Sequence, residues 1–174
     1  DVGRVTCRTD GIKDYTDHLY ESINGDLSGL NICIDCANGA SAAAARQLFP
    51  RLGAKCTFIG VEPDGKNINA GVGSTHLDNL EKAVVEGGFD CGIAFDGDAD
   101  RCLACDEKGQ EIDGDKIIAL LAMNMKEKGC LDGNTAVVTV MSNLGFIKFM
   151  ESQEIRTEKT AVGDRYVLEN MREN

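Results

Sequence analysis

Residues 30–61 have the sequence LNICIDCANGASAAAARQLFPRLGAKCTFIGV, and this stretch decides the fold class. Its first seven residues predict a strand, which ends at the Asn-Gly turn signal of residues 38–39. The alanine-rich residues 40–52 favour a helix, and Gly53 lies just beyond its expected end. Residues 54–61 predict a second strand. A strand, a helix and a strand in this order indicate parallel strands of one sheet.

The same alternation of strand and helix continues through the rest of the chain. Further helices are expected at residues 12–23, 75–86, 115–128 and 144–150 and from residue 164. Further strands are expected at residues 91–95, 102–106, 111–112, 135–141 and 155–160, with a hairpin-type return between the second and third of these. We therefore predict an α/β fold of mostly parallel sheets with helices on both faces. One complete domain would span residues 1–108, and residues 109–174 would begin a second, similar domain.

The composition restricts the classes of partner. The 174 residues include 29 Asp and Glu against 18 Lys and Arg, which gives a net charge of -11. Such an acidic chain lacks the basic clusters that hold nucleic acids or anionic membranes, so neither is expected as a partner. No basic and apolar leader opens the chain, which predicts a cytoplasmic location, and its start at Asp1 suggests a fragment of a longer protein. The oligomeric state stays open.

The eight cysteines are best interpreted as free, partly buried thiols of a reducing compartment. Two pairs, Cys33 with Cys36 and Cys102 with Cys105, have the spacing of zinc ligands. Both pairs lie in expected strands, where residues three positions apart point to opposite faces. A shared zinc site is therefore disfavoured.

Residues 96–101, with the sequence DGDADR, carry the chemistry of the chain. Asp96, Asp98 and Asp100 follow an apolar strand directly, and ligand sites of open α/β sheets lie at the carboxyl ends of strands. The small residues between them allow the backbone to direct three carboxylates at one point. Such hard oxygen ligands suit Mg²⁺ or Ca²⁺. Arg101 adds a cation suited to bidentate binding of phosphate, so the stretch predicts a site for phosphoryl groups.

Three other interpretations compete with the phosphoryl site. A solvated acidic turn needs no ligand. An EF-hand calcium loop fits the spacing of the acids, but Arg101 occupies the sixth position, where that loop requires glycine. An aspartate-based phosphatase would use Asp96 as nucleophile and Asp98 as acid.

Several stretches together resemble the α-D-phosphohexomutase family, above all its bacterial branch that acts on glucosamine phosphates. The most specific are residues 95–101 (FDGDADR), 139–146 (TVMSNLGF) and 162–167 (VGDRYV), and residues 61–69 (VEPDGKNIN) and 73–76 (GSTH) support them. The resemblance covers nearly the whole chain. The acidic loop departs from the commonest family form only in Ala99, where glycine is frequent.

The resemblance implies the second domain and the beginning of the third domain of a four-domain enzyme. Such an enzyme interconverts glucosamine 6-phosphate and glucosamine 1-phosphate for amino-sugar metabolism and cell-wall precursor synthesis. It transfers the phosphoryl group through a phosphoserine on another domain. Asp96, Asp98 and Asp100 would bind Mg²⁺, and Arg101 would be the catalytic residue that stabilises the phosphoryl group. This fragment alone would be inactive.

Alternatives to that function are a family member acting on mannose or glucose phosphates, and a non-catalytic acidic calcium-binding module. Arg165, Ser142 and Asn143 are further candidates for binding the phosphosugar substrate. For Arg165 the structural alternative is an ion pair with a neighbouring acid, and for Ser142 or Asn143 it is the cap of the helix at 144–150. Ser74 or Thr75 is likewise expected to cap the helix at 75–86.

Overall fold

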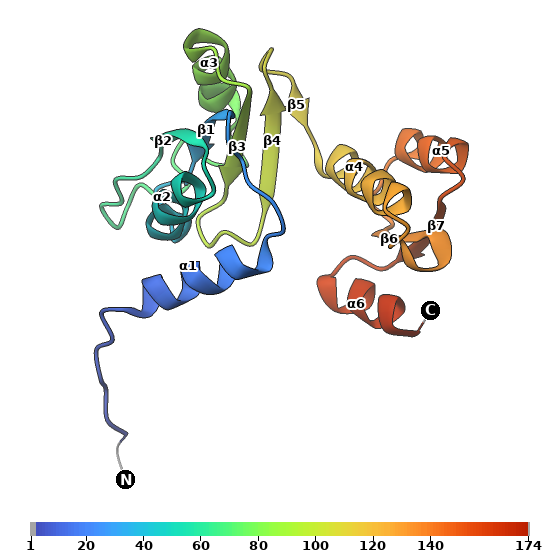
Figure 1. Cartoon of the computed structure of the whole chain (residues 1–174), viewed down its shortest axis with the longest axis horizontal. Helices are drawn as coiled ribbons and strands as arrows, with labels where there is room; N and C mark the ends of the chain where they lie inside the picture. Colours follow the sequence, from blue (N-terminus) through green and yellow to red (C-terminus); the bar gives the residue numbers. More distant parts are fainter. Residues whose placement is uncertain (1–2, 174) are drawn as a thin grey trace. The chain divides into compact units, whose positions relative to one another are not determined.

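The computed structural model of the chain describes residues 3–173 and divides into two units between Ile112 and Asp113 (Figure 1). Unit 1 therefore extends beyond residue 108, where the sequence places the domain boundary. The reason is local, because the short strand β5 (Glu111–Ile112) pairs with β4 (Cys102–Asp106) and so belongs to the first sheet.

Unit 1 contains one five-stranded sheet in the order β2-β1-β3-β4-β5. Its remaining elements are α1 (Gly11–Ser22), β1 (Asn31–Asp35), α2 (Ser41–Arg51), β2 (Lys55–Ile59), α3 (Asp78–Gly87) and β3 (Cys91–Phe95). Strand β1 runs parallel to both β2 and β3, whereas β4 and β5 are antiparallel to their neighbours. The antiparallel β4–β5 pair is the hairpin-type return expected from the sequence.

Helices cover both faces of this sheet, because successive residues of a strand point to opposite sides. Ile32 and Ile34 of β1 lie in a buried cluster with Ala42 of α2. Cys33, between them, lies in a second cluster with Leu80 of α3. Figure 1 shows α2 in teal and α3 in green beside the strands. The predicted α/β fold is thereby confirmed.

The cysteines follow the same alternation. Cys33 belongs to the cluster on the α3 face and Cys36 to the cluster on the α2 face. All eight cysteines are free thiols; five are buried or half-buried, as predicted, whereas Cys7, Cys102 and Cys130 are exposed. Burial raises the pKa of both Cys33 and Cys105 to about 11, so these thiols stay protonated at neutral pH.

Unit 2 is a smaller α/β arrangement around a parallel pair of strands, β6 (Thr135–Thr139) and β7 (Arg156–Thr160). Its helices are α4 (Gly114–Glu127), the short 3₁₀ helix η1 (Asp132–Asn134), α5 (Leu144–Ser152) and α6 (Asp164–Glu173). Val138 and Ile155 pack with Phe146 and Met150 of α5 and Ala122 of α4 in a single buried cluster. None of the helices within residues 3–173 combines the length and the apolar character needed to cross a bilayer.

Candidate metal centre

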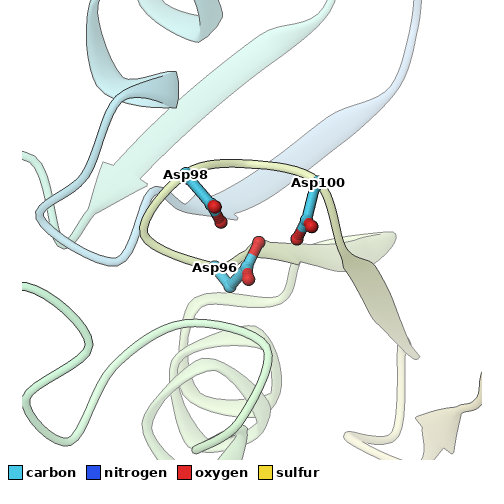
Figure 2. Close-up of side chains that lie close together, drawn as sticks. All are labelled: Asp96, Asp98 and Asp100. Atoms are coloured by element: carbon cyan, nitrogen blue, oxygen red, sulfur yellow. The ribbon is translucent and has the colours of Figure 1, made fainter.

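The acidic residues of the sequence motif meet in the loop that joins β3 to β4, which we call the metal loop (residues 96–101). One carboxylate oxygen from each of Asp96, Asp98 and Asp100 lies within 4.8 Å of the others. Figure 2 shows the three side chains directed toward the inside of the loop. Ala99 takes a left-handed φ of 63° at the tip, a conformation that glycine adopts more easily. The loop thus gathers the three acids as predicted.

Asp96 is the buried member of the group, with only 1% of its side chain exposed. The backbone N–H of Arg101 donates to its Oδ1 at 3.0 Å, and Nε of Arg101 donates to its Oδ2 at 2.7 Å. Burial acts to raise the pKa of Asp96, but the two bonds and the charge of Arg101 outweigh it, so this pKa lies below its usual range. Asp96 is therefore an ionised carboxylate that fixes the adjacent arginine.

Asp98 and Asp100 are exposed. The negative charge of Asp98 raises the pKa of Asp100, and desolvation and the charge of Asp96 add to this rise. Nε of Arg101, 3.6 Å from Oδ1 of Asp100, compensates only part of this repulsion. Three carboxylates with unbalanced negative charge are the donor set that a hard divalent cation accepts, so these residues fit Mg²⁺.

The backbone on either side of Asp96 is held by two other loops. The N–H of Ala40 donates to the carbonyl of Gly97 at 2.9 Å, and the N–H of Ser74 donates to the carbonyl of Phe95 at 3.0 Å. The expectation that Ser74 or Thr75 caps α3 is wrong, since that helix begins at Asp78 without a side-chain cap. The chain around Ser74 runs along the end of β3 instead of starting the helix.

Asp35 is a member of this region that the sequence reasoning missed. It is the last residue of β1, and its carboxylate is completely buried. Its Oδ1 accepts the N–H of Ala37 at 2.8 Å, and its Oδ2 accepts the N–H of Gly73 at 2.7 Å. An acid between Ile34 and Cys36 in a predicted strand was the available signal, because carboxylates are rarely buried without a partner.

The candidate substrate residues belong to unit 2 and have local roles there. Asn143 caps α5, since its side chain accepts the N–H of Phe146 at 2.8 Å, and its Nδ2 donates to Asp115 at 2.8 Å. Arg165 forms an ion pair with Glu169 one turn along α6, at 2.8 Å. Ser142 lies in the turn between β6 and α5, where its N–H donates to the carbonyl of Thr139. The structural alternatives for Arg165 and Asn143 are thus both present, and substrate binding by these residues stays a prediction.

Comparison with known families agrees with this division of the chain. The family model described as phosphoglucomutase/phosphomannomutase, alpha/beta/alpha domain II, matches residues 13–109. The model for alpha/beta/alpha domain III of the same family matches residues 113–174.

Individual relatives carry a more specific name. A phosphoglucosamine mutase of Clostridium tetani is 54% identical over 171 residues, which are 98% of this chain and 38% of that protein. A phosphoglucosamine mutase of an Arthrobacter species is 53% identical over 173 residues, again 38% of that protein. The chain therefore spans well under half the length of these relatives.

Solved structures share the fold at much lower identity. A phosphoglucomutase/phosphomannomutase family protein of Burkholderia thailandensis matches 93% of this chain and 35% of its own, with a TM-score of 0.77 and 22% identity. An N-acetylglucosamine-phosphate mutase in its apo form matches 90% of this chain and 37% of its own, with a TM-score of 0.65 and 20% identity. At these identities the likeness concerns the fold alone.

Proposed function

Since the chain belongs to the phosphoglucomutase/phosphomannomutase family, we propose that it is the metal-binding part of a Mg²⁺-dependent phosphoglucosamine mutase. The parent enzyme would interconvert glucosamine 6-phosphate and glucosamine 1-phosphate. The observation that carries this proposal is the metal loop, in which three carboxylates converge beside an arginine at the end of β3. The relatives named phosphoglucosamine mutase support the choice of substrate.

Asp96, Asp98 and Asp100 would hold Mg²⁺ through their carboxylate oxygens. When bound there, the ion would supply positive charge that neutralises the three acids and the oxygens of a phosphoryl group. The exposed positions of Asp98 and Asp100 leave these two carboxylates accessible to a cation from solvent.

Arg101 would stabilise the phosphoryl group during transfer. Asp96 orients this residue by accepting hydrogen bonds from both its backbone N–H and its Nε. The Arg101 side chain is 64% exposed and so remains accessible to a phosphosugar. A guanidinium held in place binds phosphoryl oxygens with directed, charge-assisted hydrogen bonds. It also needs little rearrangement during the reaction, so little free energy is spent on moving it. Phosphoryl transfer depends mainly on such positioning and electrostatics.

The phosphoserine that accepts and returns the phosphoryl group would come from a part of the parent enzyme outside these 174 residues. We therefore expect this chain alone to bind Mg²⁺ weakly and to lack mutase activity. Sustained interconversion of the two glucosamine phosphates by the purified chain would contradict this assignment.

Metal binding is tested by calorimetric titration of the chain with Mg²⁺. Asp98→Asn should abolish measurable binding, because it removes one of three ligands. Glu107→Gln removes the same charge from the exposed turn between β4 and β5, and this control should bind like the wild-type chain. Equal binding by all three proteins, or sub-micromolar affinity for Ca²⁺ with none for Mg²⁺, would contradict the proposal; the second result would favour the calcium-binding module.

Substrate choice is tested in the full-length parent enzyme. Its turnover of glucosamine 6-phosphate should exceed its turnover of mannose and glucose phosphates, and Arg101→Lys should reduce kcat by about 100-fold or more, since lysine lacks the planar fork. Preferred turnover of a mannose or glucose phosphate would replace the substrate named here and keep the metal site.

A further inference from the structure

Three loops meet at the carboxyl ends of β1 and β3. They are the metal loop, the β1 loop (residues 36–40) and the glycine loop (residues 67–74). The β1 loop holds the metal loop through the bond from Ala40 to Gly97. The glycine loop holds the residue before it through the bond from Ser74 to Phe95. A third bond, from the N–H of Asn69 to the carbonyl of Ala37 at 2.9 Å, joins the two supporting loops to each other.

The backbones of these loops are packed too closely for side chains to separate them. A Cβ at Gly39 would lie 2.3 Å from the carbonyl oxygen of Gly97. A Cβ at Gly73 would lie 2.6 Å from Cβ of Ala37 and 2.7 Å from the carbonyl oxygen of Phe95. A displacement of either supporting loop would therefore be transmitted to the metal loop, because closely packed atoms cannot absorb it.

Asp35 is the last residue of β1, directly before the β1 loop, and it bonds to both supporting loops. Its two oxygens accept one N–H from Ala37 in the β1 loop and one from Gly73 in the glycine loop. The site is enclosed, since a Cβ at Gly60 would lie 2.4 Å from Oδ1 of Asp35. Ala37 and Asn38 have left-handed φ values of 55° and 50°, which alanine in particular adopts only where its surroundings enforce it.

We propose that Asp35 is a positioning residue for the metal loop, which it fixes through the backbones of the β1 loop and the glycine loop. This inference rests on the proposed metal-binding function. Asp35 itself is buried behind the loops and would not touch the cation or the substrate. Its effect would be to keep the carbonyls of Phe95 and Gly97, and with them the three acids, in one arrangement.

The chemistry of the contact explains why the residue is an aspartate. A carboxylate of this length offers an acceptor oxygen to each of two N–H groups. Asparagine fills the same volume but offers one acceptor, and its amide group would face the second N–H as another donor. Asp35→Asn therefore removes one connection with little change in shape, and it leaves a buried N–H unsatisfied.

Three variants of the 174-residue chain separate positioning from general stability. Asp35→Asn breaks the connection, and Asp96→Asn damages the metal site directly. Val84→Ala removes buried volume on the opposite side of β3 from the α2 cluster, near Gly92 and away from the metal loop. Each variant is measured by urea unfolding, by Mg²⁺ titration, and by amide hydrogen exchange at Ala40 and Ser74, whose N–H groups hold the metal loop.

Asp35→Asn is expected to weaken Mg²⁺ binding by about tenfold, as supporting residues of metal ligands do. It should also speed exchange at Ala40 and Ser74 under conditions where the chain stays folded. Val84→Ala should lower the urea midpoint while it leaves Mg²⁺ affinity and these two amides unchanged. If Asp35→Asn binds Mg²⁺ like wild type and its two amides stay protected, the positioning role is overturned.

Failure of the proposed function gives a different result. In that case the wild-type chain and Asp96→Asn would give the same Mg²⁺ titration, whatever Asp35→Asn does. Exchange in the wild-type chain also tests the inference if Asp35→Asn does not fold. The N–H groups of Ala37 and Gly73 lie in loops yet should be as protected as those of β1, and exchange at the rate of an open loop would overturn the proposal.

Discussion

Two arginine–carboxylate pairs, one in each unit, have nearly the same length and different surroundings. In unit 1, Nε of Arg101 lies 2.7 Å from Oδ2 of Asp96. In unit 2, Nε of Arg165 lies 2.8 Å from Oε1 of Glu169. Asp96 is 1% exposed, whereas Glu169 is 51% exposed and Arg165 is 82% exposed on the surface of α6. An exposed pair within one helix contributes little, because water and salt screen it.

The comparison extends to the backbone. Both units place polar residues after a parallel strand, at residues 96–101 after β3 and at Ser142 and Asn143 after β6. In unit 1 this segment is held by two other loops, whereas in unit 2 Asn143 caps the next helix and bonds to Asp115 at the start of α4. A strand end is thus the place for a site, and the burial and packing around it decide how firmly the side chains are held.

The largest effect on the free energy of unfolding is expected when alanine replaces a glycine that has no space for a side chain. Gly39→Ala should lower the free energy of unfolding of unit 1 by about 3 kcal/mol, because its Cβ would meet the backbone oxygen of Gly97. Gly114→Ala, in unit 2, has open space around it and should stabilise the start of α4 by about 0.5 kcal/mol. Urea unfolding followed by NMR amide signals of each unit measures both. A Gly39→Ala chain as stable as wild type would mean that the two loops separate easily.

The two arginine pairs should respond unequally to loss of the carboxylate charge. Asp96→Asn should cost unit 1 about 2 kcal/mol, because it weakens a buried acceptor of two hydrogen bonds. Glu169→Gln should change unit 2 by less than about 0.5 kcal/mol. The same unfolding measurement compares them. Equal costs would show that burial of Asp96 is not what distinguishes the pairs.

Much of the fold follows from the sequence because its signals are local. The strand predicted at 30–36 and the alanine-rich helix predicted after it lie near the observed bounds of β1 and α2. The predicted start of α3 was wrong, because Ser74 bonds instead to Phe95, a residue distant from it in the sequence. Propensity at a helix end cannot reveal such a competing contact.

The acids of the site were predictable because they lie in one short segment after an apolar strand. The convergence of Asp96, Asp98 and Asp100 was expected from their spacing, and the structure brings them together. Asp35 could not be linked to them in the same way, since its partner Gly73 lies on another loop. Only the parallel pairing of β1 with β3 brings the ends of these segments side by side.

A smaller effect should separate the two candidates after β6. Asn143→Ala should lower the stability of unit 2 by about 1 kcal/mol, because it removes the cap of α5. Ser142→Ala should change it by less than about 0.5 kcal/mol, because Ser142 bonds to Thr139 through its backbone N–H, which alanine keeps. Unfolding followed through amides of α5 measures both variants. If Asn143→Ala left α5 unaffected, the cap would not be its role, and the predicted contact with the phosphosugar would gain weight.

The smallest expected effect is a difference in pKa between two carboxylates of the metal loop, the buried Asp96 and the exposed Asp100. The charge of Asp98 raises the pKa of Asp100, while hydrogen bonds from Arg101 overcome burial and lower that of Asp96. Asp96 therefore stabilises the fold above its unfolded pKa and loses this contribution as the pH falls through its folded pKa. Asp100 stabilises the fold below its unfolded pKa and loses this contribution as the pH rises through its folded pKa.

Side-chain carboxyl ¹³C shifts, recorded against pH without divalent metal, measure the two pKa values separately. In Asp98→Asn the pKa of Asp100 should fall toward its ordinary value, because the largest cause of its rise is gone. The pKa of Asp96 should stay below its ordinary value, since its bonds to Arg101 remain. If the pKa of Asp100 stayed equally high in Asp98→Asn, the acids would not be close enough to share a cation. The main physical argument for a metal site in this loop would then fail.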